Sequence, residues 1–204
     1  MLAVEQFTKR DKCKISDMNT FQQDLDEATL YHGHLCSGQI VGVRMARFAL
    51  KMLGIDDPKV FRDLVVYVEC DRCLTDAIGT VTGCKLGRRN LKWMDYGKSA
   101  ATFLNIETGE AIRLFSKKKT KPAEDADLVE FFNVIPDEDL FGFYHVKVHY
   151  SPDDLPGKPL SDAIACPKCG ERVIDGRQVL VDGVFMCKAC AYGAYYDIAG
   201  SDDL

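Results

Sequence analysis

Apolar residues recur at helical spacing in the first quarter of the chain. Residues 17–31 alternate apolar and polar positions in the manner of an amphipathic helix, which we expect to end near Gly33. The apolar positions of this helix are Phe21, Leu25 and Ala28. A longer apolar stretch, GQIVGVRMARFALKML, follows Ser37, which is suited to be its N-cap, and precedes Gly54, which is suited to end it. Because this second helix is apolar on most sides, we expect it to lie at the centre of the fold.

Several other segments have the alternation or β-branched composition of strands. The expected strands are 64–69, 99–106, 110–116 and 143–150, with the middle two joined as a hairpin by a Glu-Thr-Gly turn. A short helix is predicted from Thr75 or Asp76 toward Gly83, and another over 123–135. The pattern therefore predicts an α+β fold with an antiparallel sheet and packed helices, followed by a small C-terminal zinc-finger module.

A domain boundary is predicted where the apolar pattern stops. Residues 151–163 carry prolines and few apolar residues, which is typical of a linker. We therefore expect a core domain over residues 1–155 and a four-cysteine zinc-binding module over residues 164–204.

Charge and composition restrict the classes of partner. The chain has 204 residues and a formal net charge of −5, which argues against a surface built mainly for nucleic acid. The N-terminal residues lack the apolar core of a signal peptide, and no apolar run is long enough to span a membrane. We therefore expect a cytoplasmic protein without a membrane partner.

The last four cysteines have the spacing of a metal site. They form C-x2-C-x17-C-x2-C, which falls within the range expected for zinc, and they are Cys166, Cys169, Cys187 and Cys190. Four thiolates fill a tetrahedral shell, so this zinc is expected to be structural and to drive the folding of a module too small to fold alone. The two Asp-Gly pairs between the knuckles favour a hairpin there. A rubredoxin-like iron site and unbound thiols are the alternatives.

A second group of metal-binding residues lies in HGHLCSG, residues 32–38. His32, His34 and Cys36 share one face if this segment is extended, whereas only His32 and Cys36 are neighbours on a helix. A helix N-terminus depresses the pKa of a cysteine, which makes Cys36 a good ligand or nucleophile. We predict a metal or active site here, with His34 favoured as the partner of Cys36. The alternative is a histidine that caps the preceding helix.

Residues after the first strand can complete this site. Cys73 follows the strand and is the expected distant partner of Cys36, as a ligand or catalytic residue. Cys70 and Cys73 also have the spacing of a redox pair. Asp76 either orients a metal-binding histidine or is an acidic residue matched to a helix N-terminus.

Two further residues are candidates for cofactor binding. Cys84 ends the short helix beside Gly83, and Lys98 lies in the loop DYGKSA. The basic segment KLGRRNLK, residues 85–92, can cradle an anion, although such runs of charge are usually solvated surfaces.

Taken in order, the blocks HGHLCSGQIVGVRMA, ECDRCLTDAIGTVTGCKLGRRNL and DYGKSA resemble the FmdE family, which is named after a component of formylmethanofuran dehydrogenase. The resemblance covers roughly residues 17–150, and some members carry a zinc-ribbon or treble-clef tail. The histidines, cysteines, Asp76 and Lys98 discussed above match the family's usual pattern, with Cys70 excepted. Ser37 stands where the family usually has Pro and Gly79 where it usually has Gln, and Lys85 and Arg89 alter the loop after Cys84, so the substrate can differ.

The resemblance implies an α+β core that forms an intertwined homodimer, with the histidine–cysteine cluster in a crevice that holds a metal. It also implies a link to molybdenum- or tungsten-dependent redox metabolism, although nothing here looks like a site for the molybdopterin itself.

Three functions are consistent with these features. The first is a metal-binding protein with a structural zinc and a second metal ion at an active site in the core. The second is a non-catalytic accessory subunit whose zinc module docks a redox enzyme. The third, a zinc-ribbon regulator that binds nucleic acid, is disfavoured because acidic residues balance the basic residues of the module.

Overall fold

The computed structural model describes residues 19–117, 122–123, 125–151, 154–157 and 163–199. The chain divides into two compact units, Met1–Tyr150 and Ser151–Leu204, which we describe separately. Among the described residues, no helix combines the length and the apolar character that crossing a membrane requires.

The first helix is defined at both ends by capping interactions. Helix α1 spans Phe21–His32, within the predicted range apart from residues 17–18, which lie outside the described part. Thr20 and Gln23 form a reciprocal capping box, in which each side chain accepts a hydrogen bond from the other residue's backbone N–H. Gly33 ends the helix in the left-handed conformation, as the sequence predicted.

The central helix begins at a cysteine rather than at the predicted serine. Helix α2 spans Ser37–Met52, and its N-cap is Cys36, whose backbone is extended. Ser37 is already helical, so the prediction that it caps the helix was wrong. Gly54 follows the C-cap with φ of +64°, in keeping with its predicted role at the helix end.

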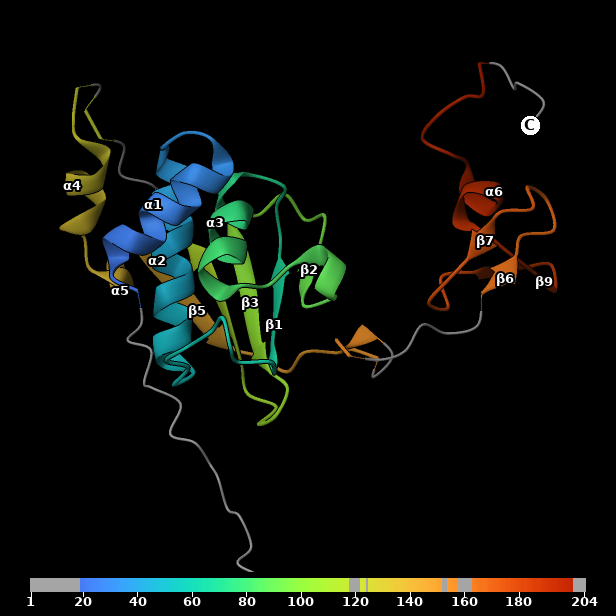
Figure 1. The fold of residues 1–204 in the computed structure, drawn as a ribbon, viewed down its shortest axis with the longest axis horizontal. Helices are drawn as coiled ribbons and strands as arrows, with labels where there is room; N and C mark the ends of the chain where they lie inside the picture. Colours follow the sequence, from blue (N-terminus) through green and yellow to red (C-terminus); the bar gives the residue numbers. More distant parts are fainter. Residues whose placement is uncertain (1–18, 118–121, 124, 152–153, 158–162, 200–204) are drawn as a thin grey trace, which may run out of the picture. The chain divides into compact units, whose positions relative to one another are not determined.

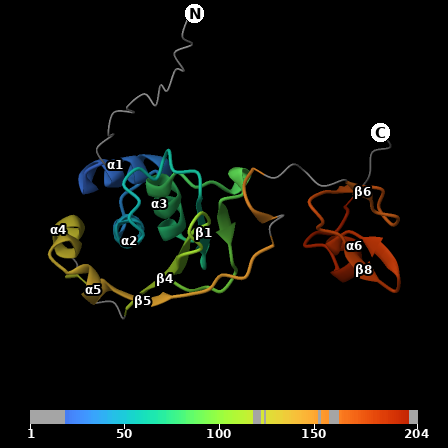
Figure 2. The same ribbon diagram turned by 90° about the horizontal axis from the view of Figure 1, so that it is seen from below.

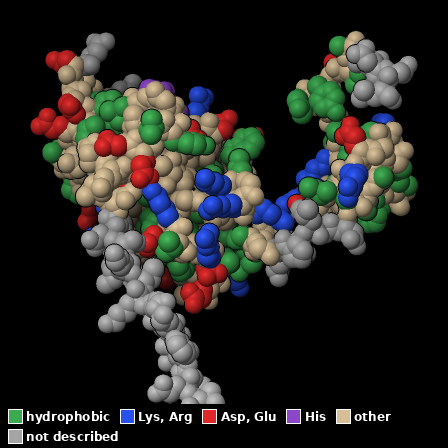
Figure 3. Space-filling model, viewed as in Figure 1, with side chains coloured by type: hydrophobic (Ala, Val, Ile, Leu, Met, Phe, Trp, Pro, Cys, Tyr) green, Lys and Arg blue, Asp and Glu red, His purple; other side chains and the backbone are tan. Residues whose placement is uncertain are grey.

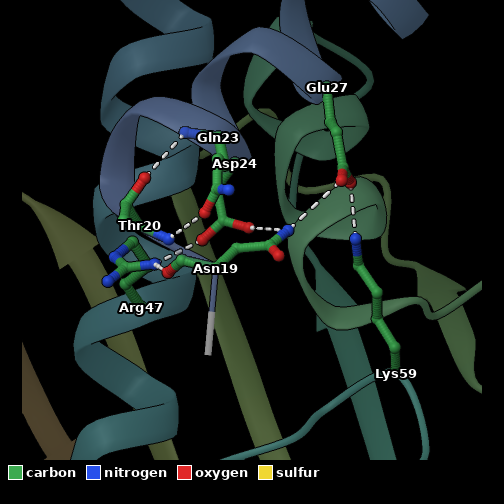
Figure 4. Close-up of polar contacts among 7 residues, drawn as sticks. All are labelled: Asn19, Thr20, Gln23, Asp24, Glu27, Arg47 and Lys59. Atoms are coloured by element: carbon green, nitrogen blue, oxygen red, sulfur yellow. Dashed lines mark hydrogen bonds and ion pairs between the residues drawn. The ribbon is translucent and has the colours of Figure 1, made fainter. Parts of the chain in front are cut away.

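A network of polar side chains fixes α1 against α2 and the following loop (Figure 4). Arg47 of α2 donates hydrogen bonds to the buried Asp24 carboxylate and to the Asn19 carbonyl oxygen. Asn19 in turn donates to Asp24 and to Glu27, and Lys59 pairs with Glu27. Burying Asp24 is tolerated because the arginine and the amide satisfy its oxygens.

Close approach between α2 and the next helix depends on a glycine. Helix α3 spans Cys73–Thr82 and ends at Gly83; it begins earlier than the predicted Thr75 or Asp76. A Cβ at Gly42 of α2 would lie 2.7 Å from the Ala77 Cβ and 2.7 Å from the Leu74 carbonyl oxygen. Only glycine at this position lets the two helices pack as they do.

The core unit contains one mixed sheet with strand order β2-β1-β3-β4-β5. Its strands are β1 Leu64–Val68, β2 Leu91–Trp93, β3 Ala100–Asn105, β4 Ala111–Ser116 and β5 Phe141–His145. All neighbours are antiparallel except β1 and β2, which run parallel. The α+β class and the β3–β4 hairpin are confirmed, whereas the short β2 and the preceding 3-10 helix η1 (Leu86–Arg88) were not predicted.

One face of the sheet is the apolar core. Leu91, Val66, Phe103 and Ile112 are paired in register across four strands, and all four belong to the buried core cluster. Helices α1, α2 and α3 cover this face (Figures 1 and 2). The sheet and helices therefore hold the N-terminal ends of α2 and α3 in fixed positions at one end of the unit.

The edge strand differs from its prediction in extent. Strand β5 covers Phe141–His145 rather than 143–150, because its partner β4 begins at Ala111, whose carbonyl oxygen accepts the last ladder bond from Val146. The helix expected over 123–135 is the shorter α4 (Leu128–Asn133), and α5 (Asp137–Leu140) follows it. Arg44 of α2 ties both to the core by donating to the Phe132 carbonyl oxygen and to Asp137.

The C-terminal unit is built from short elements around the cysteines. They are β6 Ile164–Ala165, β7 Arg172–Val173, β8 Val179–Val181, β9 Val184–Met186 and α6 Lys188–Tyr192. Strands β8 and β9 form a hairpin, as predicted, and its turn places Asp182 and Gly183 at φ of 49° and 82°.

Candidate metal sites

The four late cysteines converge on one point. The thiol sulfurs of Cys166, Cys169, Cys187 and Cys190 all lie within 4.8 Å of one another. The distance between the Cys169 and Cys187 sulfurs is 3.9 Å, close to the roughly 3.8 Å edge of a tetrahedron with metal–sulfur bonds of about 2.3 Å. The cluster can therefore hold a single metal ion.

Backbone N–H groups prepare this cluster for metal. Hydrogen bonds from the Cys187 and Cys169 backbone lower the pKa of the Cys166 thiol to about 6. A hydrogen bond to the Cys187 sulfur raises the pKa of the Cys190 thiol to about 12. A metal ion would release such protons, because only thiolates bind it.

The C-terminal unit has almost no core apart from these sulfurs. Within its described ranges, 151, 154–157 and 163–199, Cys166 is the one buried residue. Apolar burial alone cannot stabilise so small a unit, so metal binding is the term that can.

In the core unit, the turn between α1 and α2 brings a second group of ligands together. Donor atoms of His32, His34 and Cys36 lie within 4.8 Å of one another. His32 is the last residue of α1, Gly33 turns the chain, and Cys36 caps α2, so the segment is neither fully extended nor helical. The sequence favoured His34 as the partner of Cys36, and the structure brings both histidines beside the thiol.

The His32 ring has one nitrogen engaged and one without a partner. Its Nδ1 lies 2.8 Å from Asp76 Oδ2, on the first turn of α3. Its Nε2 is buried and has no hydrogen-bond partner among the described residues. Histidines that bind metals are commonly oriented in this way, with a carboxylate on one nitrogen and the metal on the other.

Cys73 lies beside Cys36 because a glycine separates their helices. A Cβ at Gly38 would lie 3.6 Å from each of the two sulfurs and only 2.8 Å from the Cys73 Cβ. Burial, and then a hydrogen bond with the Cys36 sulfur, raise the pKa of the Cys73 thiol. Cys73 stands outside the group of mutually close donors formed by His32, His34 and Cys36, so it is a neighbour of that group rather than a member.

A cavity opens beside these two cysteines. It has a volume of about 400 Å³, and its walls include the three thiols Cys36, Cys70 and Cys73 together with Arg72, Gly97 and Ser99. Cys70 itself is buried, with its sulfur 4.0 Å from the Thr75 hydroxyl. A small molecule in this cavity would meet the Cys36 and Cys73 sulfurs directly.

Two buried polar residues near this region were not identified from the sequence. Gln39 is fully buried, and its amide donates to the Cys73 carbonyl oxygen at 2.7 Å. Its only signal was a polar residue in a helix that is apolar on most sides. Glu69 follows β1 and accepts two hydrogen bonds of 2.7 Å from Arg113 of β4, a pairing across strands that no local pattern reveals.

The two remaining candidates lie at different places. Cys84 is buried beyond the C-terminal end of α3, with its sulfur 3.7 Å from the Leu64 carbonyl oxygen, at the opposite end of that helix from Cys73. Burial raises the pKa of the Cys84 thiol to about 11, which makes it a poor ligand. Lys98 lies in the segment between the cavity and β3, with its Nζ 5.6 Å from the centre of the Tyr96 ring.

The basic segment after Cys84 forms part of the surface. Lysine and arginine side chains gather over η1 and β2 (Figure 3), and those of the segment are Lys85, Arg88, Arg89 and Lys92. These residues are exposed or partly exposed, which matches the solvated surface considered from the sequence.

Known proteins share this combination of features. The family described as "FmdE, Molybdenum formylmethanofuran dehydrogenase operon" matches residues 31–138. A probable S-adenosyl-L-methionine-binding protein of Archaeoglobus fulgidus is 33% identical over 202 residues, covering 83% of this chain and 52% of its own length. The chain thus spans about half the length of that curated relative.

A solved structure has the same fold. The crystal structure of an FmdE-like protein of tungsten formylmethanofuran dehydrogenase, from Syntrophus aciditrophicus, superposes with a TM-score of 0.58 at 23% identity, covering 87% of this chain and 95% of that one. The present chain is an α+β protein with a cysteine cluster that can hold a metal ion. It belongs to the FmdE family, as the sequence blocks indicated.

Proposed function

We propose that this chain is a two-metal protein, with a structural zinc in the C-terminal unit and a second metal ion at an open active site in the core. Zinc is the metal that four thiolates at this spacing typically select, and a closed shell leaves it no position for a substrate. The core site, by contrast, has three close donors and a cavity beside them.

The observation that carries the core site is the state of the His32 ring. Its Nε2 is buried without a partner among the described residues, while Asp76 holds Nδ1 at 2.8 Å. A buried imidazole nitrogen left without a hydrogen bond is costly, and a metal ion would remove that cost. In this proposal His32 Nε2, His34 and Cys36 bind the ion, and Asp76 orients His32.

An incomplete protein shell would suit the core site to chemistry on a bound small molecule. A metal ion there would supply Lewis acidity or an activated water. The chain's own residues would bring Cys73 beside the reacting group and shape the cavity around it. The family further suggests a place in molybdenum- or tungsten-dependent redox metabolism, and the A. fulgidus relative suggests S-adenosyl-L-methionine as one candidate ligand.

Cobalt substitution tests the core site. Co²⁺ bound by a thiolate gives a sulfur-to-cobalt charge-transfer band, so a chain loaded at both sites should lose part of that band in Cys36→Ser and keep the part from the C-terminal unit. Ser37→Ala is the matched control and should keep the whole band. An unchanged spectrum in Cys36→Ser would contradict a core metal site.

An accessory role is supported by a different observation. The C-terminal unit exposes several large apolar side chains, and those more than half exposed include Leu180, Phe185, Tyr192, Tyr195 and Ile198. Such exposure is typical of an interaction surface, which favours docking to a redox enzyme. Capture of a molybdenum or tungsten enzyme by the full chain, lost on Tyr195→Ser and Ile198→Ser, would support this role. The homodimer that the resemblance implies stays a prediction, testable by the mass in solution.

A further inference from the structure

A second hollow lies next to the cavity of the core site. It has a volume of about 320 Å³, and its walls include Lys98, Arg113, Ser116 and Tyr144. Ser99 lines both hollows, while Gly97 lines the first and Lys98 the second. The short segment from Gly97 to Ser99 is therefore the wall between them, so a ligand in one hollow is adjacent to the other.

The groups around the second hollow favour an anion. Lys98 and Arg113 contribute two cations, and Glu69 neutralises one of them through its paired hydrogen bonds to Arg113. The Lys98 ammonium group has no carboxylate partner in the part of the chain that is described, and it contacts the Tyr96 ring instead. The Ser99 and Ser116 hydroxyls, 3.0 Å apart, add hydrogen-bond donors.

These groups are held in place by the surrounding structure. The Lys98 N–H donates to the Glu69 carbonyl oxygen at 2.9 Å, and the Ser116 N–H donates to the Ser99 carbonyl oxygen at 2.9 Å. The Arg113 guanidinium lies 5.8 Å from the Phe115 ring centre, and Tyr144 stacks on the same ring. Ligand binding here would therefore cost little ordering of the protein.

The positions of the aromatic rings depend on another glycine. A Cβ at Gly142 of β5 would lie 2.2 Å from the Phe115 ring, so only glycine leaves room for that ring over the edge strand. The ring in turn supports both Arg113 and Tyr144 on the face of the sheet opposite the helices. The second hollow is thus a shaped site rather than a gap between loosely held side chains.

We propose that the second hollow is an anion-binding subsite, and that the substrate of the core site carries a carboxylate or a phosphate that binds at Lys98. The inference rests on the proposed function for its second half, because it assigns the substrate class of the same site. Lys98 recognises the charge, Ser99 and Ser116 donate hydrogen bonds, and the reacting end of the molecule extends past Ser99 toward Cys36.

The subsite is tested first without reference to any core metal. Inorganic phosphate and acetate are titrated separately into the full chain by calorimetry, using wild type, Lys98→Met and the control Lys51→Met, an exposed lysine at the end of α2. We expect Lys98→Met to weaken the better-bound anion at least about tenfold, because a hydrogen bond to a charged group is lost. Equal binding by wild type and Lys98→Met would overturn the subsite. The anion that binds more tightly identifies the acidic group.

The link between the two hollows is tested with molecules that reach both. Mercaptocarboxylates of increasing chain length are compared with mercaptoalcohols of the same length, and binding to cobalt-loaded protein is followed by its visible spectrum. At one chain length the carboxylate should bind at least about tenfold more tightly than the alcohol in wild type, and not in Lys98→Met. Equal affinity at every length would overturn the link. A core that takes up no cobalt would contradict the proposed function, while the calorimetry would still decide the subsite.

Discussion

The His32 imidazole shares a hydrogen bond of 2.8 Å with Asp76 through Nδ1, while its other nitrogen is buried and has no partner among the described residues. This relationship joins the end of α1 to the first turn of α3, residues that are far apart in sequence. It converts an aspartate with two open interpretations into a residue that orients a metal-binding histidine in our proposal.

Removing the aspartate should weaken the core site alone. We expect Asp76→Ala to reduce metal affinity at the core about 10- to 100-fold, because His32 loses the group that fixes its orientation. Asp76→Asn keeps a hydrogen-bond acceptor but loses the charge, so it should fall between wild type and Asp76→Ala. Metal titration of each variant checks the order, and equal affinities would remove Asp76 from the site.

The glycine between α2 and α3 should tolerate no side chain. Gly42→Ala places a methyl group 2.7 Å from Ala77 Cβ, and we expect it to lower the free energy of unfolding of the core unit by about 1–3 kcal/mol. Urea unfolding followed by Trp93 fluorescence measures this, because Trp93 is the single tryptophan and lies in β2. Gly87→Ala, which meets open space, should be close to neutral, and equal effects of the two variants would contradict the packing argument.

Removing the late metal should unfold one unit and leave the other. Chelation, or Cys190→Ser, should abolish hydrogen-exchange protection in the β8–β9 hairpin, because among the described residues of that unit only Cys166 is buried. The Trp93 unfolding transition of the core unit should not change. Protection that survives complete metal removal would show that the unit is stabilised in another way.

The buried Cys84 thiol should make the core unit less stable in alkali. Its pKa in the folded chain is raised to about 11, so an unfolded chain ionises first as the pH rises. The stabilising effect of the neutral thiol is complete below its unfolded pKa and is lost between about pH 9 and 11, by about 2–3 kcal/mol. The difference between wild type and Cys84→Ala in Trp93-monitored unfolding at pH 7 and 10.5 isolates this effect, and a difference independent of pH would contradict it.

The sequence predicted the elements whose signals are local. The capped helix α1, the apolar α2 and the β3–β4 hairpin each carry their own spacing or turn residues, and the four late cysteines carry theirs. Strand β2 was missed because three residues are too few for a pattern, and β5 was misplaced because its end is set by where β4 begins.

The parts of the candidate site that escaped prediction depend on contacts between distant residues. The Glu69–Arg113 pair and the Gln39 contact to Cys73 join residues that only folding brings together. Cys84 appeared to belong with Cys73 because they bound the same short helix, yet a helix separates its two ends. The role of Cys36 as an N-cap could not be distinguished from that of Ser37, since both precede the same apolar run.

The central claim, a metal ion in the core separate from that of the C-terminal unit, is tested most directly by metal content per chain. Wild type and Cys36→Ser are purified identically, and their metals are quantified by mass spectrometry against protein concentration. We predict two metal ions per chain in wild type and one, the late-cysteine zinc, in Cys36→Ser. One metal ion in wild type that Cys36→Ser retains would contradict the core site.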